Sequence, residues 1–236
     1  MRIAALYDIH GNLPALEAVL AEVSAARVDE IVVGGDVLWG PLQAECVERL
    51  RRESSGWVAG NCERNVLNPT SESDHWCRER LDDELRSFAA TWAPSLEREV
   101  EGLGHVVFCH ATPGDDEGIL TRLTSDDDVR ERFDATDADL VVCGHTHVQF
   151  DRSVPGAPRI VNAGSVGLPY EGRPGACWAL LEREVELRRT PYDVESALDL
   201  LERVGFPSFA DLFPDALRGT TTAEEATGHF ESLRGA

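Results

Sequence analysis

Short apolar runs alternate with amphipathic segments through the first 60 residues. The runs at 3–7, 30–34 and 56–59 are almost continuously apolar and end in turn residues, which is typical of buried strands. Between them, the segments at about 12–23 and 41–52 carry apolar residues at the spacing of one helix face. This βαβαβ order predicts a layered α/β core.

Residues 63–100 have a different character. They keep a helical period but are rich in charged residues, with Trp76 and Trp92 scattered among them. We interpret the segment as a helical insertion beside the sheet edge, where such insertions often shape a substrate pocket. A plain pair of surface helices explains the pattern equally well, so both interpretations stand.

The second half of the chain is richer in strands. Apolar and alternating runs between Pro and Gly turns predict strands at 106–109, 140–144, 147–152, 159–161, 176–182 and 185–189. The last four are expected to form a second sheet together. Residues 194–204 and about 207–217 are expected to be helical, and the residues after them a loose tail.

Length and composition fit one folded domain over residues 1–236, with 42% hydrophobic residues. No apolar run approaches the ~20 residues that a membrane span needs. The N-terminal apolar run leads directly into Asp8 and His10, which cleavage of a signal peptide would remove. We therefore expect a cytoplasmic protein.

The net charge limits the kinds of partner we expect, and the cysteine pattern indicates the state of the thiols. The formal net charge is −21 and all 22 basic residues are arginine, so most of the surface would repel a polyanion. The six cysteines include no CxxC pair, which predicts free and mostly buried thiols. We expect a small-molecule partner, no membrane and no stable nucleic-acid complex; the sequence leaves a homo-oligomer open.

Five of the apolar runs end in a residue that can bind a metal ion. In layered α/β folds, ligands bind beyond the carboxyl ends of the strands. One Asp-x-His or Gly-His-Thr-His alone would be weak evidence, but here each donor has the same place relative to its strand. The candidate metal ligands are Asp8, His10, Asp36, Asn61, His110, His145 and His147.

The types of donor narrow the metal. Imidazole, carboxylate and amide donors without thiolate suit Mn(II), Fe, Co(II), Ni(II) or Zn rather than a structural zinc site. Asp36 has two carboxylate oxygens and can bridge two ions. Two ions about 3.5–4 Å apart are the recurring arrangement for phosphoryl hydrolysis. We expect two divalent metal ions, with Mn(II) or Fe favoured and Ni, Co or Zn as alternatives; their charge would offset the acidic balance of the chain.

The order of these residues resembles that of the calcineurin-like metallophosphoesterases. The matching motifs are Asp8-x-His10-Gly11-Asn12, Gly34-Gly35-Asp36, Gly60-Asn61-Cys62-Glu63, His110 and Gly144-His145-Thr146-His147. Residues 37–41 and 162–167 look similar to segments of the small bacterial and archaeal phosphodiesterase branch. The resemblance implies an α/β fold, a four-layer αββα sandwich of two mixed β-sheets flanked by helices. It also implies one ion held by Asp8, His10 and His147, a second held by Asn61, His110 and His145, and Asp36 as the bridge.

One position departs from the family pattern. Many members have a histidine after the metal-binding Asn, placed to protonate the leaving group or to stabilise charge on the phosphoryl oxygens, but this chain has Cys62. A thiol with an ordinary pKa of about 8.5 cannot replace a cationic imidazole. The small phosphodiesterase branch often has cysteine here too, so Cys62 does not predict inactivity, and a space-filling thiol is its plainer interpretation. It does disfavour substrates with a poor leaving group.

The residues that match the family suggest roles at the site. The catalytic candidates are Asp36, Asn61, Cys62 and His145, and the substrate-binding candidates are Asn12, Arg64 and His75. No sequence argument places Arg64 or His75 at the site beyond their position in or beside the insertion.

The expected function is hydrolysis of small soluble phosphodiesters, cyclic nucleotides among them, by in-line attack of a hydroxide that bridges two metal ions. The alternatives are a phosphomonoesterase, a dinucleoside polyphosphate hydrolase or a protein phosphatase. The last lacks support because Asp-Arg-Gly is missing at Asp36. A metal-binding scaffold without catalysis is less favoured because all seven candidate ligands are present.

Overall fold

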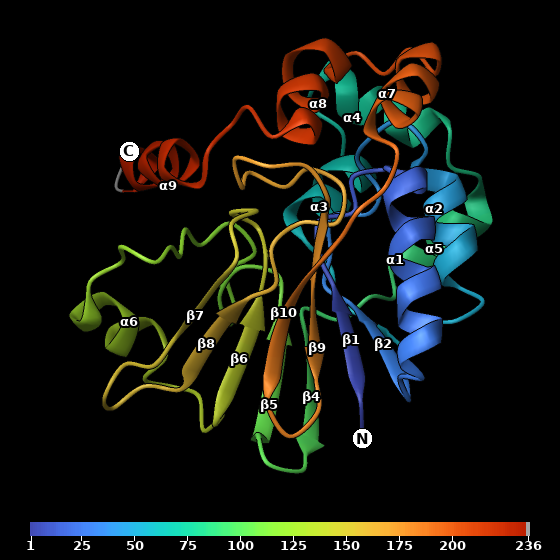
Figure 1. The fold of residues 1–236 in the computed structure, drawn as a ribbon. Helices are drawn as coiled ribbons and strands as arrows, with labels where there is room; N and C mark the ends of the chain where they lie inside the picture. Colours follow the sequence, from blue (N-terminus) through green and yellow to red (C-terminus); the bar gives the residue numbers. More distant parts are fainter. Residues whose placement is uncertain (235–236) are drawn as a thin grey trace.

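Two five-stranded sheets form the centre of the computed structural model, which describes residues 1–234 (Figure 1). The strands of the first sheet, in spatial order, are β10 (Val185–Thr190), β9 (Ala176–Leu181), β1 (Ile3–Leu6), β2 (Glu30–Val33) and β3 (Gly56–Trp57). Those of the second sheet are β4 (Ser95–Val100), β5 (Gly104–Cys109), β6 (Leu140–Cys143), β8 (Arg159–Asn162) and β7 (Phe150–Arg152). In the first sheet, β9 and β10 extend the parallel set β1–β2–β3 on one side by antiparallel pairing, and β3 is the other edge. In the second sheet, the antiparallel strands β4 and β7 flank the parallel set β5–β6–β8 on both sides.

The expectation that the last four predicted strands form one sheet is wrong. β7 and β8 extend the second sheet, whereas β9 and β10 belong to the first, where Ile3 of β1 lies opposite Leu181 of β9. This pairing joins the two halves of the chain. A local pattern of apolar residues predicts a strand but not so distant a neighbour.

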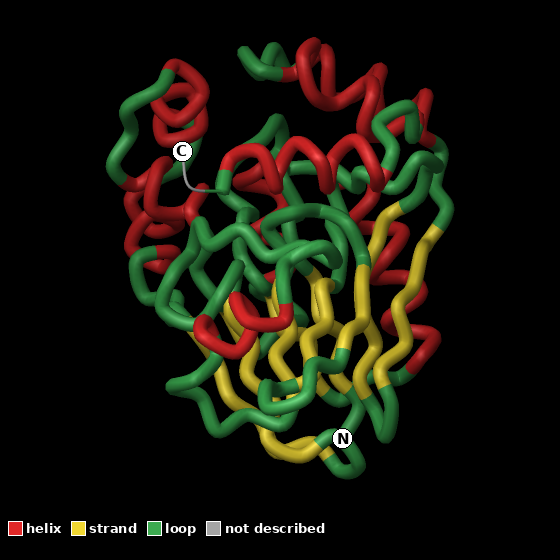
Figure 2. The backbone as a smooth tube through the Cα atoms, turned by 90° about the vertical axis from the view of Figure 1, so that its left-hand side faces the viewer, coloured by secondary structure: helices red, strands yellow, loops and turns green. Residues whose placement is uncertain are grey.

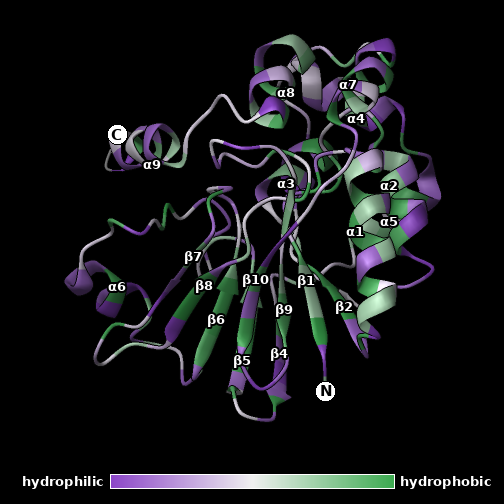
Figure 3. Ribbon diagram, viewed as in Figure 1, coloured by the Kyte–Doolittle hydropathy of each residue, from purple (hydrophilic) through white to green (hydrophobic). Residues whose placement is uncertain are grey.

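Helices cover the outer face of each sheet and give four layers, as the resemblance implied. α1 (Leu13–Ala26) and α2 (Gln43–Leu50) pack on the first sheet, and α6 (Asp126–Arg132) packs on the second (Figures 1 and 2). β1 shows how the strands serve two layers, because Ile3 lies in the apolar cluster between the sheets and Ala4 in the cluster under the helices. Several strands, β1 and β6 among them, are hydrophobic along much of their length, while the helices contain both hydrophilic and hydrophobic residues (Figure 3). Successive residues of a strand point to opposite faces of the sheet, which explains why Ile3 and Ala4 lie in different clusters.

The predicted insertion is helical over a shorter range than expected. It consists of α3 (Asn61–Leu67), α4 (Glu72–Glu79) and α5 (Asp83–Ala89). Residues 95–100, which we expected to be helical, form β4 and pair antiparallel with β5. The second sheet thus recruits the end of the segment as its edge strand.

The C-terminal part is also helical beyond the predicted boundary. α7 (Val194–Arg203) and α8 (Phe209–Arg218) agree with the expected helices, but the residues expected to be a loose tail form α9 (Ala223–Leu233). Thr222 caps α9, since its side chain accepts a hydrogen bond from the Glu225 backbone N–H. Among residues 1–234, no helix combines the length and apolarity that crossing a membrane requires.

Candidate metal centre

The fold brings all seven candidate ligands to the carboxyl ends of the parallel strands, and we call this edge the metal edge (Figure 1). Both sheets contribute. Asp8, His10, Asp36 and Asn61 follow strands of the first sheet, and His110, His145 and His147 follow strands of the second. The short loops that follow these strands therefore supply the ligands, and they come from both sheets.

The backbone of these loops is held in an uncommon conformation. Six non-glycine residues among those described have a positive φ, and five of them are candidate ligands: Asp8, His10, Asp36, His145 and His147. Such conformations cost free energy and persist where surrounding contacts over-determine them, typically at functional sites. Here the loops hold one another, because the Asp8 and His10 N–H groups donate to the Gly35 and Asp36 carbonyls at 3.1 and 2.9 Å.

One cluster of donors consists of Asp8, His10 and His147. The Nε2 atom of His147 lies 3.2 Å from Asp8 Oδ1 and 3.1 Å from His10 Nε2. His147 Nδ1 donates to the Leu168 carbonyl at 2.8 Å, and His10 Nδ1 donates to the Trp39 carbonyl at 3.3 Å. These bonds fix the rings and leave both Nε2 lone pairs for a metal ion.

A second cluster consists of Asp36, His110 and His145. His110 Nδ1 donates to the Gly34 carbonyl at 2.9 Å, and its Nε2 lies 3.4 Å from Asp36 Oδ2 and 3.1 Å from Asn61 Oδ1. The His145 ring stands edge-on to that of His110, with 5.3 Å between centroids. The amide of Asn61 thus joins this cluster rather than the first.

Asp36 belongs to the second cluster and also approaches the first. Its Oδ2 is 3.8 Å from His10 Nε2 of the first cluster and 3.4 Å from His110 Nε2 of the second. The backbone N–H of Cys62 donates to its other oxygen at 2.9 Å. A carboxylate in this place suits the bridging role that the resemblance implied.

The electrostatics of the metal edge fit bound cations. Asp8 and Asp36 are both buried, and Asp8 Oδ1 has no hydrogen-bond partner although it is shielded from water. Burial alone would lower the pKa of His110, but the Asp36 and Asp8 carboxylates outweigh burial and raise it to about 10. Burial, helped by His147, lowers the pKa of His10 to about 4. A buried carboxylate oxygen without a donor is costly unless a cation completes it, so the donor set fits divalent metal ions.

Glu63 is a functional residue that our sequence reasoning missed, although it stands in a quoted motif. Its carboxylate is 1% exposed and accepts four backbone N–H bonds, from Asp36, Val37, Leu38 and Gly60, at 2.7–3.0 Å. It thereby ties the loop after β2 to the start of α3. Its place in the first turn of a helix that begins at Asn61 was the available signal.

Cys62 lies within the site. Its sulfur belongs to a group with His10 and Asp36 whose potential ligand atoms are all within 4.8 Å of one another. Burial and the negative charge of Asp36 raise the pKa of the thiol well above its ordinary value. The residue beside Asn61 therefore presents an uncharged thiol.

The three substrate-binding candidates have unlike positions. Asn12 is fully buried and caps α1, and its amide donates to the Gly167 carbonyl at 2.9 Å, so it shapes the loop and cannot reach a substrate. His75 is exposed on α4, and no described contact connects it with the metal edge. Arg64 lies beside the metal edge, but its guanidinium is paired with Asp116 and Glu117 at 3.0 and 3.1 Å.

Two pockets adjoin the metal edge. One of about 420 Å³ reaches from His110 to Arg64, Trp92 and Pro94. The other, of about 370 Å³, lies between Tyr170 and the C-terminal helices.

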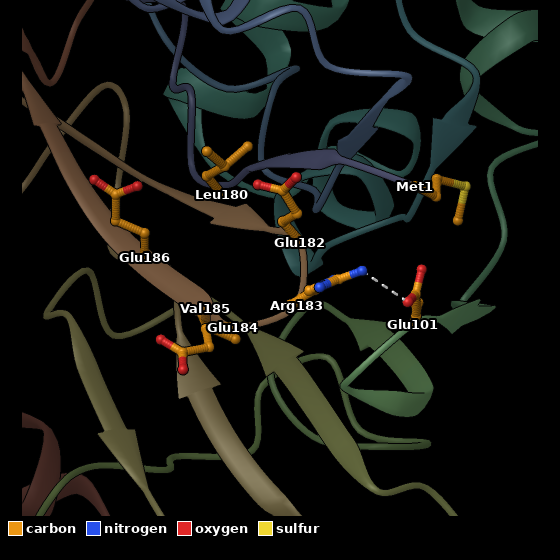
Figure 4. A pocket seen from close by; sticks show the side chains of 8 residues that line it. All are labelled: Met1, Glu101, Leu180, Glu182, Arg183, Glu184, Val185 and Glu186. Carbon is orange, nitrogen blue, oxygen red and sulfur yellow. Dashed lines mark hydrogen bonds and ion pairs between the residues drawn. The ribbon is translucent and has the colours of Figure 1, made fainter.

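A third pocket, of about 750 Å³, lies at the opposite ends of the strands (Figure 4). Met1 and the turn at Glu182–Glu184 line it, and the Arg183 guanidinium pairs with Glu101 at 3.1 Å across it. Asp8 follows the other end of β1, so this pocket is separate from the metal edge.

Known proteins match most of the chain. The model of the calcineurin-like phosphoesterase superfamily domain matches residues 1–185. A protein of Methanocaldococcus jannaschii that is described as uncharacterized is 27% identical over 234 residues, which cover 88% of this chain and 94% of that protein. The crystal structure of a metallophosphoesterase from Sphaerobacter thermophilus has 26% identity and a TM-score of 0.75, covering 93% of this chain and 100% of that one. The crystal structure of a hypothetical protein from Pyrococcus horikoshii has the same fold, with 17% identity, a TM-score of 0.76, and coverage of 92% and 98%.

Proposed function

The chain belongs to the calcineurin-like phosphoesterase superfamily, and we propose that it is a phosphodiesterase that hydrolyses small soluble phosphodiesters with the help of two divalent metal ions. As a member of this superfamily it is a metallophosphoesterase with buried His and Asp groups of the kind that bind metals. The proposal adds the number of ions, the diester preference and the roles of individual residues.

The observation that carries the proposal is the pair of donor clusters with Asp36 between them. We assign Asp8, His10 and His147 to one ion, Asn61, His110 and His145 to the other, and Asp36 to both. Two divalent ions in such sites activate a water and polarise the phosphoryl oxygens. The chain contributes orientation, because the rings of His110 and His147 are fixed through Nδ1 and the Asp36 carboxylate is fixed through the Cys62 N–H.

Cys62 supports the preference for diesters. A phosphomonoester with a poor leaving group needs a proton donor or an additional cation near the leaving oxygen. The thiol of Cys62 is uncharged, and the nearby Arg64 is already paired with two carboxylates. A diester carries one negative charge on its phosphate where a monoester can carry two, so its phosphoryl oxygens need less cationic stabilisation.

The proposed substrate is small rather than macromolecular. With a net charge of −21, the surface offers a nucleic acid little attraction. Mn(II) and Fe remain the favoured metals, because the donors are imidazole, carboxylate and amide groups.

The experiment is hydrolysis of bis(p-nitrophenyl) phosphate and 2′,3′-cyclic AMP by the metal-free protein after addition of Mn(II), Fe(II), Co(II), Ni(II) or Zn(II). We expect turnover that a chelator abolishes and that Asp36→Asn lowers about 1,000-fold, comparable to the loss of a single catalytic group. The amide oxygen of the introduced asparagine would still accept the Cys62 N–H bond, so a circular dichroism spectrum like that of the wild type should accompany the loss. Absence of turnover with every metal would refute the proposal. A cellular function that survives Asp36→Asn while metal binding is lost would favour a scaffold instead.

Cys62→His tests the diester preference directly. If the uncharged thiol limits the reaction of monoesters, the imidazole should raise the ratio of monoester to diester turnover. We expect a rise of about 100-fold, the lower end of what a positioned proton donor contributes. An unchanged ratio for p-nitrophenyl phosphate and an alkyl monoester, both relative to bis(p-nitrophenyl) phosphate, would remove Cys62 from the argument.

A further inference from the structure

The last two helices form one side of the pocket of about 370 Å³ beside the metal edge. We call α8 and α9, residues 209–233, the C-terminal wall. Leu212 of α8 and Ala226 and Phe230 of α9 line the pocket, and Tyr170 lines it from the side of the metal edge. The C-terminal wall lies wholly outside residues 1–185, which the family model matches.

Two residues of the pocket lining contact histidines of the metal centre. The Tyr170 ring stacks on that of His147, with centroids 4.9 Å apart and an interplanar angle of 22°. The Phe230 ring lies 6.1 Å from that of His145. A group in the pocket can therefore belong to a molecule whose phosphate is held at the metal edge.

Polar contacts hold α9 in this place. The Thr124 hydroxyl donates to the Glu231 carboxylate at 3.3 Å, and Thr121 contacts the same oxygen. The Arg234 guanidinium pairs with Glu231 and also with Asp128 of α6. These contacts join α9 to the segment between β5 and α6 and so place Phe230 at the pocket.

The lining decides what can enter. Tyr170, Leu212 and Phe230 offer aromatic and aliphatic surface, which favours a flat apolar group. The acidic residues of the lining are Asp211, Asp215 and Glu225; among the residues described, no arginine lines this pocket, and His229 is its one basic side chain. A phosphate would meet three carboxylates here against a single imidazole, so the lining disfavours it.

We propose that this pocket binds the ester arm of the substrate that does not leave, and that this arm is an uncharged aromatic group such as a nucleoside. This inference rests on the proposed diesterase function and deepens it. The substrate then has one phosphate only, since a second one would face the carboxylates of the C-terminal wall. Dinucleoside polyphosphates are accordingly poor substrates.

The experiment compares three p-nitrophenyl esters in the presence of Mn(II): the methyl phosphate, the thymidine 5′-phosphate, and the thymidine 5′-phosphate that carries a further 3′-phosphate. We expect the wild type to prefer the thymidine ester to the methyl ester in kcat/KM. Phe230→Ala should lower this preference about tenfold, as loss of a base-stacking ring does elsewhere. Leu233→Ala is the matched control, because it removes an exposed apolar side chain from the same helix outside this pocket.

A charge reversal tests the exclusion of the second phosphate. The wild type should disfavour the ester with the 3′-phosphate, and Asp211→Arg should reduce that discrimination roughly tenfold. Asp211 is exposed and makes no described side-chain hydrogen bond, so the fold should tolerate the change. Asp199→Arg on α7 changes the net charge equally outside the pocket and should leave the discrimination as it is.

Equal effects of Phe230→Ala on the methyl and thymidine esters would overturn the assignment of the pocket, and so would equal effects of the two Asp→Arg changes. Calorimetric binding of thymidine 5′-(methyl phosphate) separates this inference from the proposed function. If the wild type hydrolyses no ester but binds this compound in a Phe230-dependent way, the proposed function is refuted and the assignment of the pocket is supported. If the wild type hydrolyses the esters and binding does not depend on Phe230, the assignment of the pocket is refuted and the proposed function is not.

Discussion

The metal edge and the C-terminal wall lie side by side but are held in place differently. At the metal edge, loops with positive φ are bonded to one another and to the buried carboxylate of Glu63. In the C-terminal wall, α9 buries only Ala226 and Thr227 and is fixed through partly exposed groups such as Glu231. Metal chemistry requires donors placed within a fraction of an ångström, whereas a pocket for an organic group tolerates adjustment.

The boundary between the two regions agrees with the part of the chain that the superfamily model matches. The metal edge falls entirely within residues 1–185, which the superfamily model matches, and the C-terminal wall follows it. The reaction would thus be set by the common part and the choice of ester arm by the wall. Changes in the two regions should separate accordingly into effects on metal binding and effects on specificity.

Glu63→Ala should cause the largest loss of stability of any change considered. It would leave four buried backbone N–H groups without an acceptor and release the loop after β2 from α3. We expect the free energy of unfolding to fall by about 3–5 kcal/mol, measured by urea denaturation of the metal-free protein. Glu79→Ala on α4 removes an exposed carboxylate without a described partner and should change it by under about 0.5 kcal/mol. A similar small change for both variants would show that Glu63 does not organise the metal edge.

Gly60→Ala should affect the metal edge more narrowly. Its φ of −100° is open to any residue, but a Cβ atom would lie 2.3 Å from Asp36 Oδ1 and 2.8 Å from His110 Nδ1. The Asp36 carboxylate would have to leave its place between the clusters. We expect metal affinity about 10–100-fold weaker, the usual result of disturbing the groups that orient ligands, measured by titration with Mn(II). Wild-type affinity in this variant would mean that Asp36 need not lie where the structure places it.

The donors of the metal edge were largely identifiable from the sequence, because each lies in a loop that follows a strand; Asp8 and His10 share one such loop, and His145 and His147 share another. Within one sheet, the ends of parallel strands gather at the same edge, so Asp8 and Asp36 could be brought together without knowledge of the strand order. That His110, which follows a strand of the second sheet, joins them does not follow from this rule. The distribution of strands between the two sheets could not be predicted from the sequence, since the β1–β9 pair joins distant segments. Glu63 was visible in its motif, but its role depends on N–H groups from two separate loops.

Of the two helices of the C-terminal wall, α8 was predicted, but α9 escaped prediction for physical reasons. Between Ala223 and Leu233 apolar residues are few, and charged residues surround them, so no apolar face marks a helix that packs on a core. The contacts that fix α9 are long-range and polar, with Thr121 and Thr124 more than 100 positions away from Glu231. No pattern within the segment carries that information.

Gly228→Ala should have the smallest effect and the opposite sign to Gly60→Ala. Gly228 lies inside α9, and a Cβ atom there would meet no heavy atom within 4 Å. Alanine has the higher helix propensity, so α9 should gain about 0.5–1 kcal/mol. If α9 opens by itself, as its few buried residues suggest, hydrogen exchange of its amides should slow about two- to fivefold while that of β1 stays the same. Unchanged exchange in α9 would show that it opens only when the whole protein unfolds. The C-terminal wall would then be held as firmly as the metal edge, and the contrast between the two regions would not hold.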